Sequence, residues 1–111
     1  MPARRDFNRK RYIAFEIVSG EAGLTRKLLS REIVKRKEML GPDPKFEVIM
    51  ITRGRGIVLT THLQAKRMTD LLNSFSLEDN EFQLRTLKIS GTILTLKRKY
   101  FPNKDTSGNG K

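Results

Sequence analysis

The stretch Phe46–Thr60, FEVIMITRGRGIVLT, decides how this chain folds. Its two ends, Phe46–Thr52 and Ile57–Thr60, are rich in the β-branched residues that favour strands. Between them, Arg53-Gly54-Arg55-Gly56 predicts a hairpin turn, because glycine adopts the positive φ angles that such turns need. The middle of the chain is therefore expected to form two antiparallel strands joined directly.

The segment after this hairpin predicts a helix with one apolar face. Thr61 is expected to cap its start, and Gln64 completes a capping-box pattern. The apolar residues that follow recur at helical spacing along one stripe: Ala65, Met68, Leu71, Leu72 and Phe75. This helix is expected to cover one face of a sheet, and 76–81 is expected to be a polar loop.

The segment before the hairpin predicts another helix. Thr25 is expected to cap it, and the helix is expected to run to about Leu40, with Leu29 and Ile33 near the same face. Gly41-Pro42-Asp43-Pro44 ends it, because proline lacks a backbone donor and glycine suits a helix end.

Two more strands and a short helix complete the expected elements. The strands are Arg11–Ser19 and, roughly, Phe82–Ser90, and the helix is Thr92–Tyr100. The order β-α-β-β-α-β-α predicts an α+β fold, a ferredoxin-like sheet with two helices on one face plus a C-terminal helix.

Length and charge describe one basic domain. The chain has 111 residues, and its 23 lysines and arginines against 12 acids give a formal net charge of +11. We expect a basic arm at 1–10, a single RNA-binding domain at 11–101 and a disordered tail at 102–111. A charge of this size predicts a polyanionic partner, since it otherwise only repels itself.

Several function classes are disfavoured by what the sequence lacks. Without cysteine there is no disulfide, thiolate metal site or cysteine nucleophile. No apolar run resembles a signal peptide or a membrane span, so we expect an intracellular, cytoplasmic protein with no membrane partner. The single histidine, His62, has no obvious partner for catalysis, and the acidic loop Glu78-Asp79-Asn80-Glu81 is more typical of a solvated loop than of a Mg²⁺ site. No catalytic residue, metal site or bound cofactor is predicted.

The cations gather in groups, each with a reason to bind RNA. An aromatic residue beside cations can stack on a base while the cations contact phosphate. Like charges four residues apart destabilise a helix, so a helix that keeps them is expected to bind an anionic partner. Arginines in a turn can reach phosphate. The groups are Arg9, Lys10 and Arg11 with Tyr12; Lys27, Arg31 and Lys35; Arg53 and Arg55; and Lys97, Arg98 and Lys99. Each group also has an explanation that does not involve RNA. In the same order, Tyr12 is an ordinary strand residue, the helix cations form a solvated face, the turn arginines are merely exposed, and the last cations compensate a helix dipole. On the first helix, Glu38 is expected to offset Lys35, and Glu32 to offset Arg36.

Gly91 links the fourth strand to the last helix. It is expected to let another backbone approach closely, and the free N–H groups of the following helix are expected to receive an anion. Gly91 is therefore included among the candidate RNA-binding residues.

Two stretches carry a resemblance to a known family. Lys10–Phe15, KRYIAF, and Arg85–Ile93, RTLKISGTI, followed by the cationic block Lys97–Lys99, resemble protein component 2 of archaeal ribonuclease P. The likeness covers about residues 9 to 101, and the middle of the chain matches in layout more than in letters. The sequence departs from the family at its N-terminal arm and at Leu59–His62, where the family often has arginines.

The resemblance implies an RRM-like α/β sandwich and a subunit of the ribonucleoprotein that removes 5′ leaders from precursor tRNA. It implies that ribonuclease P RNA performs the cleavage with Mg²⁺, and that ribonuclease P protein component 3 is the protein partner. The alternatives are another RNA-binding ribonucleoprotein component, or a small ferredoxin-like enzyme in which Arg53 or Arg55 holds a phosphate. Fold alone does not separate them.

Overall fold

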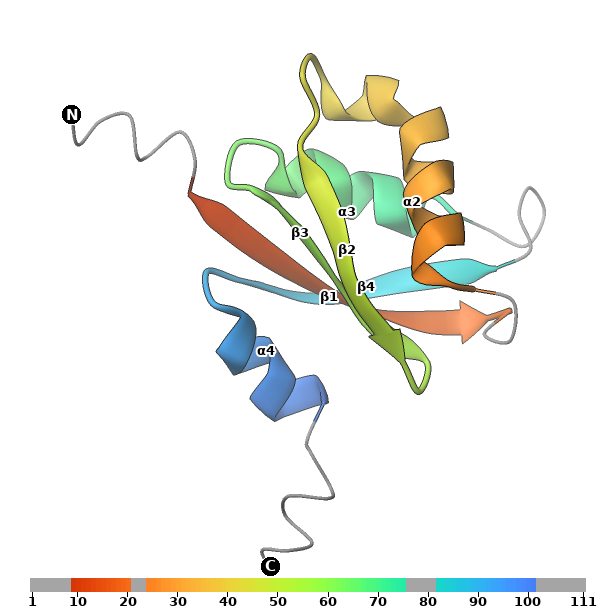
Figure 1. Cartoon of the computed structure of the whole chain (residues 1–111), viewed down its shortest axis with the longest axis vertical. Helices are drawn as coiled ribbons and strands as arrows, with labels where there is room; N and C mark the ends of the chain where they lie inside the picture. The colour runs from red at the N-terminus through yellow and green to blue at the C-terminus, as the bar shows by residue number, and fades with distance from the viewer. Residues whose placement is uncertain (1–8, 21–23, 76–81, 102–111) are drawn as a thin grey trace, which may run out of the picture.

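A four-stranded antiparallel sheet forms the centre of the molecule (Figure 1). The computed structural model describes residues 9–20, 24–75 and 82–101. The strands stand in the order β2-β3-β1-β4, and each neighbouring pair is antiparallel. Their bounds are Lys10–Ser19 for β1, Phe46–Thr52 for β2, Arg55–Thr61 for β3 and Gln83–Ser90 for β4. The predicted α+β class is confirmed.

Three α-helices and one 3₁₀ helix accompany the sheet in the described part of the chain. They are α2 (Arg26–Lys35), the 3₁₀ helix η2 (Lys37–Leu40), α3 (Ala65–Asn73) and α4 (Ile93–Tyr100). The element order is the predicted one, with η2 added. The predicted loop at 76–81, the tail at 102–111 and most of the basic arm lie outside the described residues, and Lys10 of that arm begins β1.

The central hairpin has a shorter turn than predicted. Thr52 pairs with Arg55, so the loop is the two residues Arg53 and Gly54, which have φ angles of 52° and 80°. Arg55 and Gly56 belong to β3 instead. A Cβ on Gly56 would lie 2.3 Å from Cζ of Phe15, so this glycine is required by packing between strands and not by the turn.

The helix before the hairpin is also shorter than predicted. Thr25 caps α2 as expected, because its Oγ1 accepts a hydrogen bond from the Leu28 N–H at 3.1 Å. The α-helix ends at Lys35, where the Arg36 N–H donates to Ile33 O at 2.9 Å and the chain tightens into η2. This tighter turn still leaves Leu40 fully buried.

The predicted capping box of α3 is wrong. Thr61 is the last residue of β3, and Gln64 is the N-cap without a side-chain cap bond. Its amide instead accepts from the Lys45 N–H at 2.9 Å and donates to Asp43 O at 3.2 Å. The side chain is therefore used to fix the loop before β2, and a capping pattern in the sequence cannot exclude such a competing partner.

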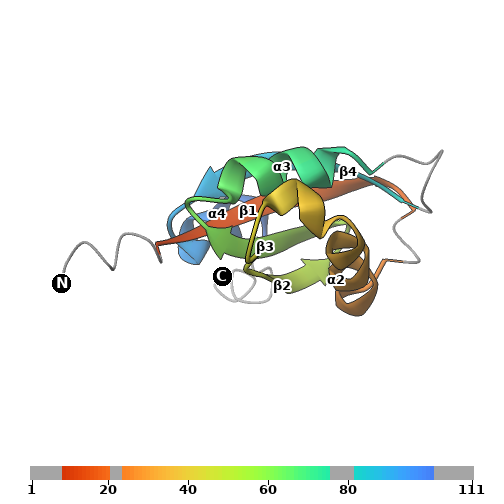
Figure 2. The same cartoon turned by 90° about the horizontal axis from the view of Figure 1, so that it is seen from above.

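The main core lies between one face of the sheet and the helices α2 and α3 (Figure 2). Strand alternation directs Ile13 and Phe15 of β1 to this face, and Phe75 packs near Phe82 with ring centroids 4.9 Å apart. The predicted stripe of α3 is confirmed, since all its members and Phe75 are buried.

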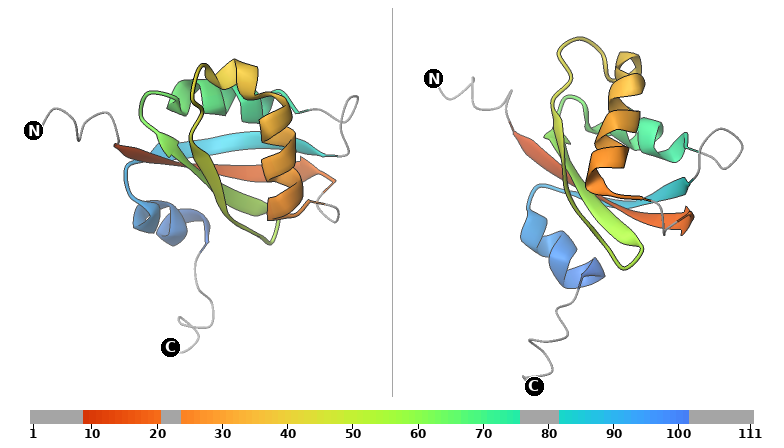
Figure 3. Two further views of the ribbon diagram at one scale, coloured as in Figure 1. Left: turned by 45° about the horizontal axis from the view of Figure 1, so that its top comes forward. Right: turned by 45° about the vertical axis from the view of Figure 1, so that its right-hand side comes forward.

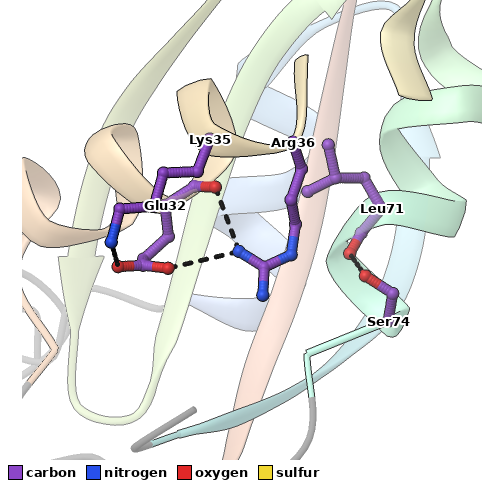
Figure 4. A network of polar contacts seen from close by, with 5 residues as sticks. All are labelled: Glu32, Lys35, Arg36, Leu71 and Ser74. Atoms are coloured by element: carbon purple, nitrogen blue, oxygen red, sulfur yellow. Dashed lines mark hydrogen bonds and ion pairs between the residues drawn. The ribbon is translucent and has the colours of Figure 1, made fainter. Parts of the chain in front are cut away.

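Arg36, just after the end of α2, contacts this core and forms a polar network with Glu32 and Lys35 (Figure 4). Its Nη1 donates to Oε1 of Glu32 at 3.2 Å, and its guanidinium carbon lies 4.4 Å from the centroid of the Phe75 ring. Lys35 Nζ reaches Oε2 of Glu32 at 3.1 Å, so Lys35 is offset by Glu32 and not by Glu38 as predicted. Burial opposes ionisation of Glu32, but hydrogen bonds and charge from Lys35 and Arg36 leave its pKa below the ordinary value.

A smaller apolar cluster lies on the opposite face, beneath α4 (Figures 1 and 3). Leu96 of α4 is fully buried there against Ala14 and Ile57. Partly buried residues surround these three: Tyr12, Ile49, Met50, Leu87, Ile93, Tyr100 and Phe101. Within the described residues, none of the helices has the length and apolar run needed to span a membrane.

Candidate nucleic-acid interface

The two stretches that carry the family resemblance lie side by side in the sheet. Tyr12 of β1 pairs with Ser90 of β4, and Ile13 pairs with Ile89. The cations at the start of β1 are therefore next to the chain that leads from β4 into α4. Strand pairing thus unites two groups that are about eighty positions apart in the sequence.

Within the described residues, Gly91 lies beside a cation and not beside another backbone. A Cβ built on it would meet Nη1 of Arg11 at 3.5 Å, which is an ordinary contact. No described segment of this chain therefore makes the close approach that Gly91 was predicted to allow, and contact of Gly91 with RNA stays a prediction. Arg11 Nη1 also donates to Lys10 O at 2.9 Å, which keeps the guanidinium near the start of α4.

The other end of α4 is held by Arg55. Its Nη1 donates to Tyr100 O at 3.1 Å, and its guanidinium carbon lies 5.6 Å from the centroid of the Tyr100 ring. Lys99 Nζ lies 5.7 Å from the same centroid. Arg55 was predicted as a turn residue that either reaches phosphate or is merely exposed; in the structure it is half-buried on β3 and anchors a helix end.

The cationic block Lys97–Lys99 occupies the last turn of α4, and all three side chains are exposed. No carboxylate of the described residues forms an ion pair with any of them. Cations at a helix C-terminus are favoured by the dipole, which stabilises the block locally and leaves its charge available. With about 1.5 Å of rise per residue, the eight residues of α4 span roughly 12 Å from end to end, with Arg11 near its start and this block in its last turn.

We define the α4 surface as these two cationic groups and the helix between them: Arg9, Lys10, Arg11, Gly91, Lys97, Arg98 and Lys99. Arg9 and Lys10 are exposed, and Arg11 is half-buried. The first turn of α4 contains no acid, and Thr92 makes no side-chain cap bond. Helix N–H groups at one end and side-chain cations at both ends can therefore hold several phosphates.

The remaining predicted residues are not exposed cations of the α4 surface. Lys27 and Arg31 are exposed on α2, which covers the other face of the sheet, and Lys35 pairs with Glu32 there. Tyr12 is partly buried in the cluster beneath α4, as an ordinary strand residue is. Arg53 is exposed at the hairpin tip. The α4 surface does not include these residues. RNA contact by the α2 cations is a prediction of the sequence, and their place on the opposite face does not favour it.

Sequence reasoning missed three charged residues on the strands of the α4 face, namely Glu16, Arg85 and Lys88. Glu16 stands between Arg55 on β3 and Arg85 on β4, and it forms an ion pair with Arg85. Lys88, opposite Ala14 on β4, is exposed. The alternation of β1 signals that Glu16 shares a face with Tyr12 and Ala14, but its charged neighbours follow only from the strand order.

His62 lies at the junction of β3 and α3. Its backbone N–H donates to Arg9 O at 2.9 Å, and its Nδ1 is buried without a hydrogen-bond partner in the described structure. Within the described ranges, no three His, Cys, Asp or Glu side chains lie close enough together to hold a metal ion. The acidic loop Glu78–Glu81 lies outside those ranges.

The chain matches no protein-family model and no curated protein sequence. The case for an RNA interface therefore rests on the charge and geometry of the α4 surface.

Proposed function

We propose that this protein is a subunit of ribonuclease P that binds the catalytic RNA and supports removal of 5′ leaders from precursor tRNA. The observation that carries this proposal is the pairing of β1 with β4, which puts KRYIAF beside SGTI and leads directly to the Lys97–Lys99 block. A resemblance based on two separated stretches gains weight when the two are spatial neighbours. The cytoplasm is the proposed location.

A ferredoxin-like or RRM-like fold is part of the same proposal. It is supported by the strand order β2-β3-β1-β4, by antiparallel pairing throughout, and by α2 and α3 on the same face. RRM-like sheets bind RNA on the face opposite their helices. Here α4 covers part of that face, so its exposed cations take the place of bare strand residues in contacting RNA.

The proposed mechanism is electrostatic. Phosphates of the catalytic RNA would be neutralised by the cations of the α4 surface, which lowers the Mg²⁺ concentration that the RNA needs to fold and cleave. The chemistry belongs to the RNA and its Mg²⁺. Apolar residues on the α4 side, including Leu94 with 53% of its surface exposed, would dock protein component 3.

The direct test is cleavage of precursor tRNA by an archaeal ribonuclease P RNA at limiting Mg²⁺. This protein and component 3 are added singly and together, and product is quantified on a gel. Activation only by the pair is the expected result. Absence of activation, with the protein folded and bound to the RNA, would assign it to another ribonucleoprotein.

A further inference from the structure

A shallow groove of about 660 Å³, largely open to solvent, lies on the helix-covered side of the molecule, between the first turn of α2 and the strand β2. Arg26 and Lys27 line it from the helix, and Phe46, Glu47 and Val48 line it from the strand. Three consecutive strand residues contribute because β2 is an edge strand, with β3 as its single neighbour in the described sheet. The groove is separate from the α4 surface, which lies on the opposite face.

The charges on the helix side of this groove are placed unfavourably for the helix itself. Arg26 and Lys27 occupy the first turn of α2, which contains no acid. Cations near the positive end of a helix dipole lower the stability of the helix. No described carboxylate forms an ion pair with Lys27. A carboxylate bound beside Arg26 and Lys27 would offset their unfavourable interaction with the dipole of α2. The Lys97–Lys99 block differs, because it lies at the C-terminus of its helix, where the dipole favours cations.

The strand side of the groove limits the length and chemistry of an occupant. Arg26 Nη1 donates to Ile49 O at 3.5 Å, and the β2–β3 register shifts between Val48 and Met50, so the accessible edge ends near Val48. The free stretch Phe46–Val48 is about 10 Å long at roughly 3.4 Å per residue. Phe46 is half-buried and presents an apolar wall, and Glu47 keeps the carboxylates of an occupant away from the strand and on the helix side, toward Arg26 and Lys27.

We propose that this groove docks a short acidic segment of a partner protein in extended conformation. Apolar side chains of the segment would lie against Phe46, and carboxylates of the segment would face Arg26 and Lys27. An edge strand beside a helix is a recurrent way to hold an extended peptide, with the backbone providing affinity and the flanking side chains providing selectivity. This inference goes beyond the proposed function and is independent of it.

The test uses a fluorescein-labelled heptapeptide of alternating leucine and glutamate, with binding followed by fluorescence anisotropy. A leucine–lysine heptapeptide is the charge control. Lys27→Glu is the test variant, and Lys37→Glu on η2 is the matched control, because it makes the same charge change on an exposed residue at the far end of the same segment. Circular dichroism establishes that both variants are folded.

We expect Lys27→Glu to weaken binding about tenfold, which corresponds to loss of one close charge pair and gain of a repulsive one. Lys37→Glu should bind nearly as the unaltered protein does. Amide shifts in an NMR titration of the unaltered protein should concentrate at 25–30 and 46–48. Equal losses in both variants, or shifts centred elsewhere, would overturn the proposal.

A single-stranded RNA oligomer added to the peptide complex separates this inference from RNA binding. Retention of the peptide while RNA binds supports two separate surfaces. Displacement of the peptide, with RNA shifting the same amides, would make the groove a nucleic-acid surface and overturn the inference without affecting the proposed ribonuclease P role. Failure of the precursor-tRNA assay would in turn leave the peptide result unchanged.

Discussion

The two faces of the sheet carry apolar clusters of very different size. On the face covered by α2 and α3, fourteen buried residues of the described chain form one cluster. On the α4 face, Ala14, Ile57 and Leu96 are the three buried members, surrounded by partly buried side chains. The larger cluster specifies the fold. The smaller one serves chiefly to seat a cationic helix on the sheet, with Arg55 fixing its far end.

The largest expected effect compares one truncation on each face. Phe75→Ala should lower the free energy of unfolding by about 3–5 kcal/mol, since it removes a fully packed ring and its contacts with Phe82 and Arg36. Leu96→Ala should cost about 2 kcal/mol, at the low end for leucine, because α4 can shift to fill the space. Urea denaturation measures both. Equal losses would show that α4 is as integral to the fold as α3.

Two glycines sharpen the comparison at the level of single contacts. Gly56→Ala should lower stability by roughly 1–3 kcal/mol, because the new Cβ would lie 2.3 Å from Phe15 Cζ and 2.7 Å from Met50 O. Gly91→Ala should change it little, since its nearest neighbour is the flexible Arg11 side chain at 3.5 Å and its φ is not positive. Thermal unfolding of both variants measures the difference. A large loss of stability in Gly91→Ala would indicate that another backbone does approach Gly91 closely.

The anchor of α4 is tested by Arg55→Met, with Arg53→Met as the matched control at the exposed hairpin tip. Arg55→Met should cost about 1 kcal/mol through loss of the bond to Tyr100 O. Hydrogen exchange should accelerate in the last turn of α4 and nowhere on α2 or α3. Arg53→Met removes the same charge and should leave hydrogen exchange in α4 unchanged. Equal exchange rates in the two variants would mean that Arg55 does not hold the end of α4.

The smallest effect depends on pH and belongs to the helix-covered face. The pKa of Glu32 is lowered in the folded protein, so its stabilisation is present above the pKa of an unfolded glutamate, about 4.3, and is lost as the pH falls through the lower folded value. Glu32→Gln should therefore cost at most about 1 kcal/mol at neutral pH and progressively less in acid. Urea midpoints from pH 3 to pH 7 measure this, and a constant gap would contradict it.

Periodicity predicted most of the fold. The stripe of α3 and the alternation in β1 require only local sequence, and their buried sides follow directly. The errors arose where a residue had two competing roles. Gln64 could cap a helix or fix a distant loop, and Gly56 could serve a turn or make room for Phe15. The choice between such roles depends on tertiary neighbours that the local sequence does not contain.

The candidate site was predicted only in part, because its geometry also depends on tertiary neighbours. Charge clustering identified Arg9–Arg11 and Lys97–Lys99, but only the pairing of β1 with β4 brings the first group to the start of α4. The role of Arg55 depends on a contact forty-five positions along the chain. The α2 cations were grouped with the others by sequence, and the sheet separates them from the α4 surface.

The most direct measurement compares the salt dependence of RNA binding for equal charge losses on the two faces. Affinity for the catalytic domain of ribonuclease P RNA is measured across salt concentrations for Lys97→Ala/Arg98→Ala and for Lys27→Ala/Arg31→Ala. Each cation that contacts phosphate contributes about one to the slope of log affinity against log salt. The α4 pair should lower that slope by about two, and the α2 pair should leave it nearly unchanged. Equal slopes for the two pairs, or a larger loss for the α2 pair, would contradict the assignment of RNA binding to the α4 surface.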